Sequence, residues 1–248
     1  MSIETAEQLS ALRRAGTVVR QMLEAMKQSV RPGVTTGRLD EIGAQVMRRE
    51  GAVSAPKSVY GFPGTTCISI NDEAVHGIPS DRVIREGDLV KLDVTIEKDR
   101  YMADAAETVI AGSASEENRR LAACARRAFD NAMLVARAGF RINEIGRVIE
   151  REVRRNGFSI IRELGGHGIG RTIHEEPFVP NYADRRANEI LTDGLVITVE
   201  PIIAARKGSV LTDRDGWTVR TLDGSASAHY EQTIVITKGR PILLTAAA

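Results

Sequence analysis

The segment that decides the fold is Leu89-Val-Lys-Leu-Asp-Val-Thr-Ile-Glu-Lys-Asp-Arg-Tyr-Met-Ala-Asp-Ala-Ala-Glu-Thr-Val-Ile110. Two β-prone runs flank a polar group at residues 97–100, which predicts a β-hairpin. If residues 98 and 99 form a two-residue loop, Asp93 faces Asp104 across the two strands. Like charges that lie directly opposite each other destabilise a hairpin. The segment therefore predicts a strand pair whose acids share a proton or bind a metal ion.

Alternation along the first strand of this hairpin separates two faces. Val90, Leu92, Val94 and Ile96 share one face, whereas Asp93 lies on the other. We expect the apolar face to pack on helices and the acids to point into a polar region. An isolated aspartate pair is more often simply solvated, so the interpretation depends on the rest of the chain.

Two further acids and three histidines occur in related settings. Glu200 follows a β-prone run that begins at Leu195, and Glu231 lies within the β-prone residues 226–237. Four acids are thus predicted on four strands. The histidines that lie beside or near glycines are His76, His167 and His174. Such histidines are better placed to meet a ligand than isolated ones are.

The chain also contains an internal repeat. Helical periodicity predicts helices over residues 5–28, 36–50, 115–139 and 143–156, one pair in each half. Residues 84–93 match residues 191–200 at an offset of 107, and both segments end with a carboxylate. A repeat this long favours two halves packed about a pseudo-twofold axis over a solenoid. We expect one domain with halves of about 1–112 and 113–248.

Composition argues against several classes of protein. The 248 residues include 34 basic and 33 acidic ones, and this near balance does not favour binding to nucleic acid. The first residues lack the pattern of a secretory signal, and no apolar run reaches the roughly 18 residues of a membrane span. Cys67 and Cys124 predict free buried thiols. We therefore expect a cytoplasmic protein without a membrane segment.

Six motifs carry a resemblance to a known family. They are Cys67-Ile-Ser-Ile-Asn-Asp-Glu-Ala-Val-His76-Gly-Ile-Pro79, Lys91-Leu-Asp93-Val94, Gly166-His167-Gly-Ile-Gly170, His174-Glu-Glu-Pro177, Val199-Glu200-Pro201 and Tyr230-Glu231-Gln-Thr233. These motifs occur in the order and approximate spacing of the methionine aminopeptidases, and the chain resembles that family, specifically its type I bacterial form. The resemblance implies an α+β pita-bread (creatinase/aminopeptidase-like) fold, a pseudo-twofold curved antiparallel sheet with two helix pairs on the outside. It also implies a single catalytic domain that removes N-terminal methionine before a small second residue.

The resemblance assigns a dinuclear metal centre. The implied ligands are Asp93, Asp104, His167, Glu200 and Glu231. Asp104 and Glu231 are expected to bridge the two ions. Four carboxylates carry four negative charges, which two divalent cations would balance. Oxygen donors with one nitrogen and no thiolate suit Mn(II), Fe(II) or Co(II) better than a structural zinc ion.

The resemblance also assigns roles around the reacting bond. Glu200 is implied to accept a proton from the attacking water, and His76 and His174 to contact the scissile amide and the developing oxyanion. The methionine side chain would lie against Phe62, Cys67, Ile173 and Trp217. His76 and His174 therefore count as both catalytic and substrate-binding residues.

Three other interpretations are weaker. A prolidase or Xaa-Pro aminopeptidase uses similar ligands but usually carries a large extra N-terminal domain, and only 75 residues precede His76. A type II enzyme carries an insertion that the interval from Glu200 to Glu231 is too short to hold. A non-catalytic module on this fold usually lacks metal ligands, whereas all five are present here.

The expected partners follow from the implied reaction. They are peptides with N-terminal methionine and nascent polypeptides, with no direct nucleic-acid function and no membrane. Arginine pairs on the predicted helices are more simply a solvated face than a surface for transient ribosome association. We expect the protein to be a monomer.

Overall fold

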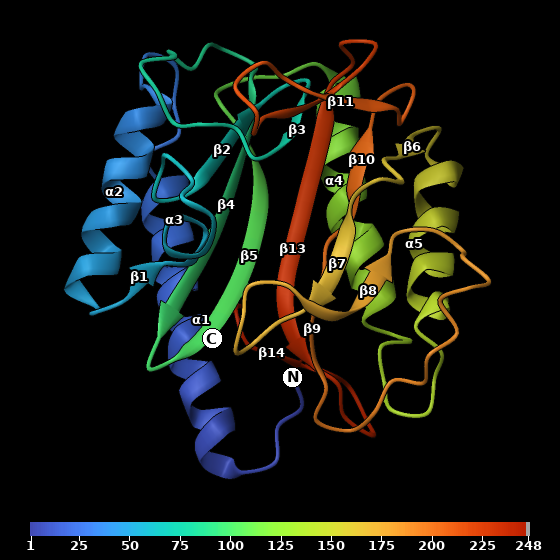
Figure 1. The fold of residues 1–248 in the computed structure, drawn as a ribbon. Coiled ribbons are helices and arrows are strands. Elements are labelled where there is room, and N and C mark those ends of the chain that lie inside the picture. The colour runs from blue at the N-terminus through green and yellow to red at the C-terminus, as the bar shows by residue number, and fades with distance from the viewer. Residues whose placement is uncertain (247–248) are drawn as a thin grey trace.

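An antiparallel sheet with helices behind it organises the computed structural model, which describes residues 1–246 (Figure 1). Within that range the helices are α1 (Ala6–Lys27), α2 (Thr36–Arg49), α3 (Ala55–Tyr60), α4 (Glu116–Ala132) and α5 (Asn143–Arg155). The strands of the first half are β1 (Val53–Ser54), β2 (Cys67–Ile70), β3 (Glu73–Val75), β4 (Leu89–Lys98) and β5 (Tyr101–Ile110). The later strands are β6 (Ser159–Ile160), β7 (Gly165–Gly168), β8 (Glu175–Pro180), β9 (Val196–Val199), β10 (Ile202–Ala204), β11 (Val210–Thr212), β12 (Val219–Thr221), β13 (Ser227–Val235) and β14 (Ile242–Leu243).

The main sheet brings the two halves of the chain together at its centre. Its order is β1-β4-β5-β13-β9-β7-β8, and the flanking strands β2, β6, β10 and β14 attach beside this row. Strands β11, β12 and β3 form a separate small sheet. The central neighbours β5 and β13 pair through Glu107 with Tyr230, Ala106 with Glu231 and Ala105 with Gln232. Residues far apart in sequence therefore meet in the middle of the sheet.

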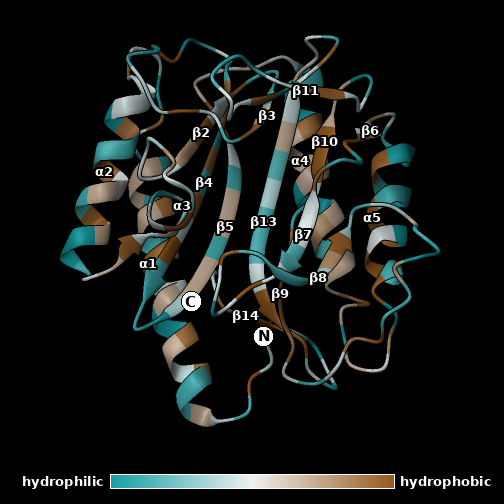
Figure 2. Ribbon diagram, viewed as in Figure 1, coloured by the Kyte–Doolittle hydropathy of each residue, from teal (hydrophilic) through white to brown (hydrophobic). Residues whose placement is uncertain are grey.

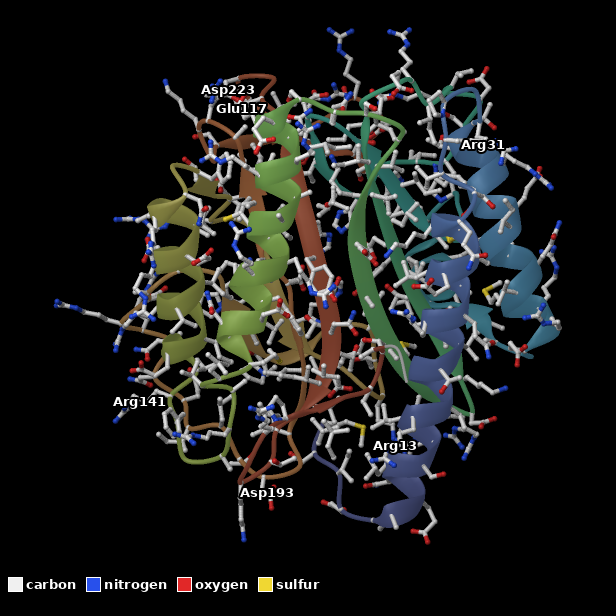
Figure 3. All side chains as sticks on the ribbon, turned by 180° about the vertical axis from the view of Figure 1, so that it is seen from behind. Arg13, Arg31, Glu117, Arg141, Asp193 and Asp223 are labelled. Carbon is white, nitrogen blue, oxygen red and sulfur yellow. The ribbon has the colours of Figure 1, made fainter. Side chains whose placement is uncertain are left out.

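Two helix pairs cover the same face of the sheet, as the view from behind shows (Figure 3). Helices α1 and α2 share one buried cluster with β4 and β5, which includes Val90, Leu92, Val94 and Ile96 as predicted. Helices α4 and α5 share a second cluster with β9, β10 and β13. Hydrophilic and hydrophobic residues alternate along the helices (Figure 2), which is typical of helices with one buried side.

Equivalent backbone hydrogen bonds occur in the two halves. The Gly33 amide donates to the Ile84 carbonyl at 2.9 Å, and the Gly139 amide donates to the Leu191 carbonyl, also at 2.9 Å. These donors and acceptors are separated by the offsets of 106 and 107 found in the sequence. The boundary expected near residue 112 falls in the connection between β5 and α4.

The central hairpin differs from the sequence prediction in its register. Asp93 pairs with Ala106, and Asp104 pairs with Thr95, so the two aspartates lie diagonally and are not directly opposed. The reason is the turn, because residues 99 and 100 both have positive φ angles and form the two-residue loop. Moving the loop by one residue shifts the pairing by two, which leaves both aspartates on the same face of the sheet.

Other local expectations are partly met. Helix α4 is capped by Ser115, where the predicted range begins, but it ends at Ala132, well before residue 139, and Leu134 beyond it is 66% exposed. Asn143 is the first residue of α5 and provides no side-chain cap. Both cysteines are free and buried, as predicted. Within residues 1–246, no helix combines the length and apolar character needed to cross a membrane.

Candidate active site

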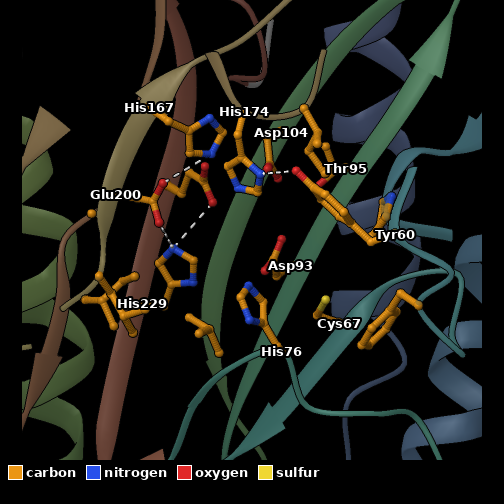
Figure 4. Close-up of a pocket in the computed structure, with 18 of the residues that line it drawn as sticks. Tyr60, Cys67, His76, Asp93, Thr95, Asp104, His167, His174, Glu200 and His229 are labelled. Atoms are coloured by element: carbon orange, nitrogen blue, oxygen red, sulfur yellow. Dashed lines mark hydrogen bonds and ion pairs between the residues drawn. The ribbon is translucent and has the colours of Figure 1, made fainter. Parts of the chain in front are cut away.

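A cavity of ≈530 Å³ opens on the side of the sheet turned away from the helix pairs. It is lined by every side chain that the sequence assigns to the site: Phe62, Cys67, His76, Asp93, Asp104, His167, Ile173, His174, Glu200, Trp217 and Glu231. Figure 4 shows the carboxylates and imidazoles converging from several strands. The fold thus brings together side chains spread over some 170 residues of sequence.

Sheet order explains how the acids meet. Asp93 lies on β4, Asp104 on β5 and Glu231 on β13, while Glu200 directly follows β9. Glu231 pairs with Ala106, so Asp104, two residues away from Ala106, lies on the same face of the neighbouring strand. The central pairing of β5 with β13 therefore joins acids from both halves of the chain.

Burial makes the charged forms of these acids costly. Asp104, Glu200 and Glu231 are 6%, 8% and 2% exposed. Burial raises the pKa of each carboxyl group well above its usual range, and the Glu231 charge further raises the pKa of Asp104 and of Glu200. Burial also raises the pKa of Asp93. Without a compensating cation, this group of carboxyls is expected to hold protons.

The donor atoms fit a metal centre. Asp104 Oδ1 and Glu231 Oε1 are buried and, within residues 1–246, have no hydrogen-bond partner. Ligand atoms lie within 4.8 Å of one another in two groups, Asp104 with His167 and Glu231, and Glu200 with His229 and Glu231. Carboxylate and imidazole donors suit divalent first-row ions. Buried acids that lack protein partners are the donors that such cations would satisfy.

Thr198 on β9 contacts two of these residues, the side chain of Glu200 and the backbone of His167. Its hydroxyl donates to Glu200 Oε1 at 2.9 Å and accepts from the His167 backbone amide at 3.0 Å. The side chain is fully buried. Thr198 therefore orients the Glu200 carboxylate and holds β7 against β9.

His167 has the tautomer that a metal ligand requires. Its Nδ1 lies 2.9 Å from the Gly168 carbonyl oxygen, which can only accept, so the proton is on Nδ1. The free Nε2 lies 3.6 Å from Glu200 Oε1. Burial, assisted by the nearby His174, lowers the pKa of His167 to about 4, so the imidazole is neutral at pH 7.

The other two predicted histidines, His76 and His174, are exposed and line the cavity. His174 Nδ1 lies 2.6 Å from the Tyr60 hydroxyl, and its ring centroid is 4.3 Å from that of His167. His76 follows β3 with a φ angle of 58°, which turns the chain at the edge of the cavity. The Tyr60 contact with His174 is not predicted from the sequence.

An apolar wall adjoins the acids. Phe62 and Trp217 pack edge to face with ring centroids 5.2 Å apart. Cys67 and Ile173 are buried beside them, and Cys67 pairs with Asp93 across β2 and β4. Burial raises the pKa of the Cys67 thiol, which stays protonated and behaves as a small apolar group. The wall and the acids thus share one cavity.

His229 is one of the site residues that are not predicted from the sequence. It lies on β13, two residues before Glu231, and its side chain is 2% exposed. The position two residues from a predicted ligand on a strand is a signal that could have found it, because such residues share a face. Burial lowers the pKa of His229 to about 4, which leaves its ring neutral.

Comparisons with known proteins agree with this geometry. The model of metallopeptidase family M24 matches residues 10–238. The chain is 42% identical over 247 residues to methionine aminopeptidase 2 of Bacillus subtilis, covering 99% of each protein. It is 40% identical to the methionine aminopeptidase of Escherichia coli K12, covering 99% of this chain and 94% of that one. The crystal structure of methionine aminopeptidase from Thermotoga maritima superposes over the full length of both chains, with a TM-score of 0.96 and 32% identity.

Proposed function

This chain belongs to metallopeptidase family M24, has a pita-bread fold and removes N-terminal methionine, and on that basis we propose the roles of its residues. The family, fold class and reaction expected from the resemblance are confirmed. The identity of the ligands, the number and kind of metal ions and the choice of substrate are the parts that we propose.

The proposed metal ligands are Asp93, Asp104, His167, Glu200 and Glu231, which would hold two divalent ions. Mn(II), Fe(II) and Co(II) are the candidate ions, since the donors are oxygens with little nitrogen and no thiolate. When bound, such ions make water a nucleophile near neutral pH and polarise the carbonyl group that it attacks. The buried oxygens of Asp104 and Glu231 without partners support this assignment.

We assign proton transfer to Glu200. Its carboxylate lines the cavity and is held at one oxygen by Thr198, so the other oxygen is free to accept a proton from water. A carboxylate that accepts this proton can deliver it to the leaving amine. Glu200 would thus serve both as a ligand and as the proton carrier.

We assign substrate contacts to the two exposed histidines. His76 and His174 line the cavity and would donate hydrogen bonds to the scissile amide and to the developing oxyanion. The methionine side chain lies against the wall formed by Phe62, Cys67, Ile173 and Trp217. Such a lining suits a flexible thioether. We also propose that the enzyme prefers a small residue after methionine.

The observation that carries the proposal is the convergence of four carboxyls and a neutral His167 beside this wall in one cavity. The test uses protein stripped with a chelator and reloaded with Mn(II), Co(II) or Fe(II) under anaerobic conditions. We expect no activity in the stripped protein and restored release of methionine from Met-Ala-Ser. Full activity without metal would refute the metal assignment.

Three peptides define the substrate choice. We expect Met-Ala-Ser to be cleaved and Met-Leu-Ser to be refused. Equal turnover of both would refute the preference for a small second residue. Ala-Pro-Ala serves as the control for a prolidase-like activity, and its cleavage in place of Met-Ala-Ser would overturn the proposed specificity.

We further propose that the natural substrates are nascent polypeptides in the cytoplasm, reached by a monomer that associates transiently with ribosomes. The basis is chemical, because initiator methionine is present when a chain emerges during synthesis. Sedimentation of the purified protein alone and with ribosomes tests both statements. A stable dimer, or complete absence of the protein from the ribosome fraction at low salt, would contradict them.

A further inference from the structure

The fourth histidine of the chain lies beside two of the proposed metal ligands, Glu200 and Glu231. His229 is 2% exposed, lines the cavity and points toward Glu200 in Figure 4. Neither of its ring nitrogens has a hydrogen-bond partner among residues 1–246. A buried imidazole with both nitrogens unpaired is costly, so its presence calls for a ligand.

The distances around His229 are those between two ligands of one ion. Its Nε2 lies 3.4 Å from Glu231 Oε2 and 3.9 Å from Glu200 Oε2. Both separations exceed the roughly 3.2 Å limit of a good N–H···O hydrogen bond. Two donors on bonds of about 2.1 Å, placed at about the tetrahedral angle, lie about 3.4 Å apart. The spacing therefore fits a shared cation better than a direct hydrogen bond.

The strand geometry explains why these three side chains lie close together. His229 and Glu231 are two residues apart on β13, so both side chains leave the strand on the same face. Backbone pairing of β10 with β13 places Ile202 opposite His229, directly after the segment that carries Glu200. The donor atoms of Glu200, His229 and Glu231 all lie within 4.8 Å of one another.

We propose that His229 is a further metal ligand, a second nitrogen donor bound through Nε2 to the ion that Glu200 and Glu231 share. The inference rests on the proposed metal centre and extends it to six protein ligands. A neutral imidazole leaves the charge balance of the centre unchanged. It also makes the donor set richer in nitrogen, which shifts affinity toward Co(II) relative to Mn(II).

The test counts the histidines that bind cobalt. The chain has four histidines, so protein labelled with ¹⁵N-histidine and loaded with Co(II) gives a small set of imidazole signals. We expect two ring N–H resonances with large paramagnetic shifts, from His167 and His229. His229→Gln should remove one, His167→Gln should remove the other, and the matched control His76→Gln should keep both.

Metal titration provides the second readout. His229→Gln should weaken Co(II) binding at one site about 10-fold or more, with a smaller loss for Mn(II). Circular dichroism of each metal-free variant controls for folding, and the labelled wild-type protein gives the histidine count without any substitution.

The outcomes separate this inference from the function on which it rests. A wild-type spectrum with the His167 resonance alone would overturn the role of His229 and leave the metal centre standing. Failure of Co(II) to bind or to shift any histidine would refute both. Two shifted resonances that survive in His229→Gln would also refute the assignment.

Discussion

Thr198→Val is the substitution that most directly tests how the site is held. Valine matches threonine in shape but has no hydroxyl group, so the change removes two contacts without opening a large cavity. The His167 backbone amide loses its acceptor, and the Glu200 carboxylate loses the donor that orients it. The consequences should appear both in stability and in metal binding.

The magnitudes follow from the two hydrogen bonds. A buried amide without a partner costs about 1–3 kcal/mol, and a hydrogen bond to a charged group contributes about 1.5–3 kcal/mol. We expect the free energy of unfolding of the metal-loaded protein to fall by about 2.5–6 kcal/mol, the sum of these two contributions. Because Thr198 contacts two of the proposed ligand residues, we also expect metal affinity to fall about 10- to 100-fold.

Calorimetric titration with Mn(II) and urea unfolding monitored by circular dichroism measure these quantities. Thr198→Ser is the matched control, since it keeps the hydroxyl group and removes one buried methyl group, worth about 1 kcal/mol. Its metal affinity should stay near that of the wild type. If Thr198→Val bound Mn(II) as tightly as Thr198→Ser, the hydroxyl group would not position the ligands and the reasoning would be refuted.

Further predictions concern the histidines and one close backbone contact. His167→Ala should lower metal affinity about 10-fold or more and regain activity at high metal concentration. His76→Ala should keep its metal affinity but lose roughly 10²-fold in both kcat and kcat/KM. Metal titration with steady-state kinetics distinguishes the two variants, and recovery of His76→Ala activity by added metal would reverse the assignment. Tyr60→Phe removes the hydroxyl that lies 2.6 Å from His174 Nδ1 and should lower kcat several-fold with unchanged metal content; an unchanged kcat would show that this contact does not orient the ring. Gly16→Ala would place a Cβ atom 2.0 Å from the carbonyl oxygen of Leu244, so thermal unfolding should reveal a loss of about 1–3 kcal/mol, and an undiminished Tm would contradict such tight packing.

Much of the fold can be predicted from the sequence because periodicity reports burial directly. The alternation along β4 identifies the helix-covered face, and the helical patterns locate both helix pairs. The turn of the hairpin is harder to predict, because the polar residues 97–100 allow more than one two-residue loop. The positive φ angles at residues 99 and 100 depend on how the flanking strands twist and pair, which composition does not specify.

In the candidate site too, some residues can be predicted from the sequence and others cannot. Acids on β-prone strands stand out, because a carboxylate in an apolar run is unusual, and every predicted site residue lines the cavity. His229 and Thr198 do not stand out, since histidine and threonine are ordinary in strands. Their importance comes from long-range pairing of β13 with β5 and β9, which a local pattern does not reveal.

The pairing of β5 with β13 also determines how much of the chain must be made before the acids of both halves can meet. A ribosome makes the chain from its N-terminus, so Asp104 emerges 127 residues before Glu231, an interval of about 6 to 25 s at typical rates of synthesis. The first half can form its hairpin and bury its helices early, but its aspartates then face an incomplete sheet. Until β13 adds beside β5, the growing polypeptide lacks the glutamate on which both groups of donors converge. With the proposed ligands, the metal site is therefore complete only after synthesis of the chain has passed β13.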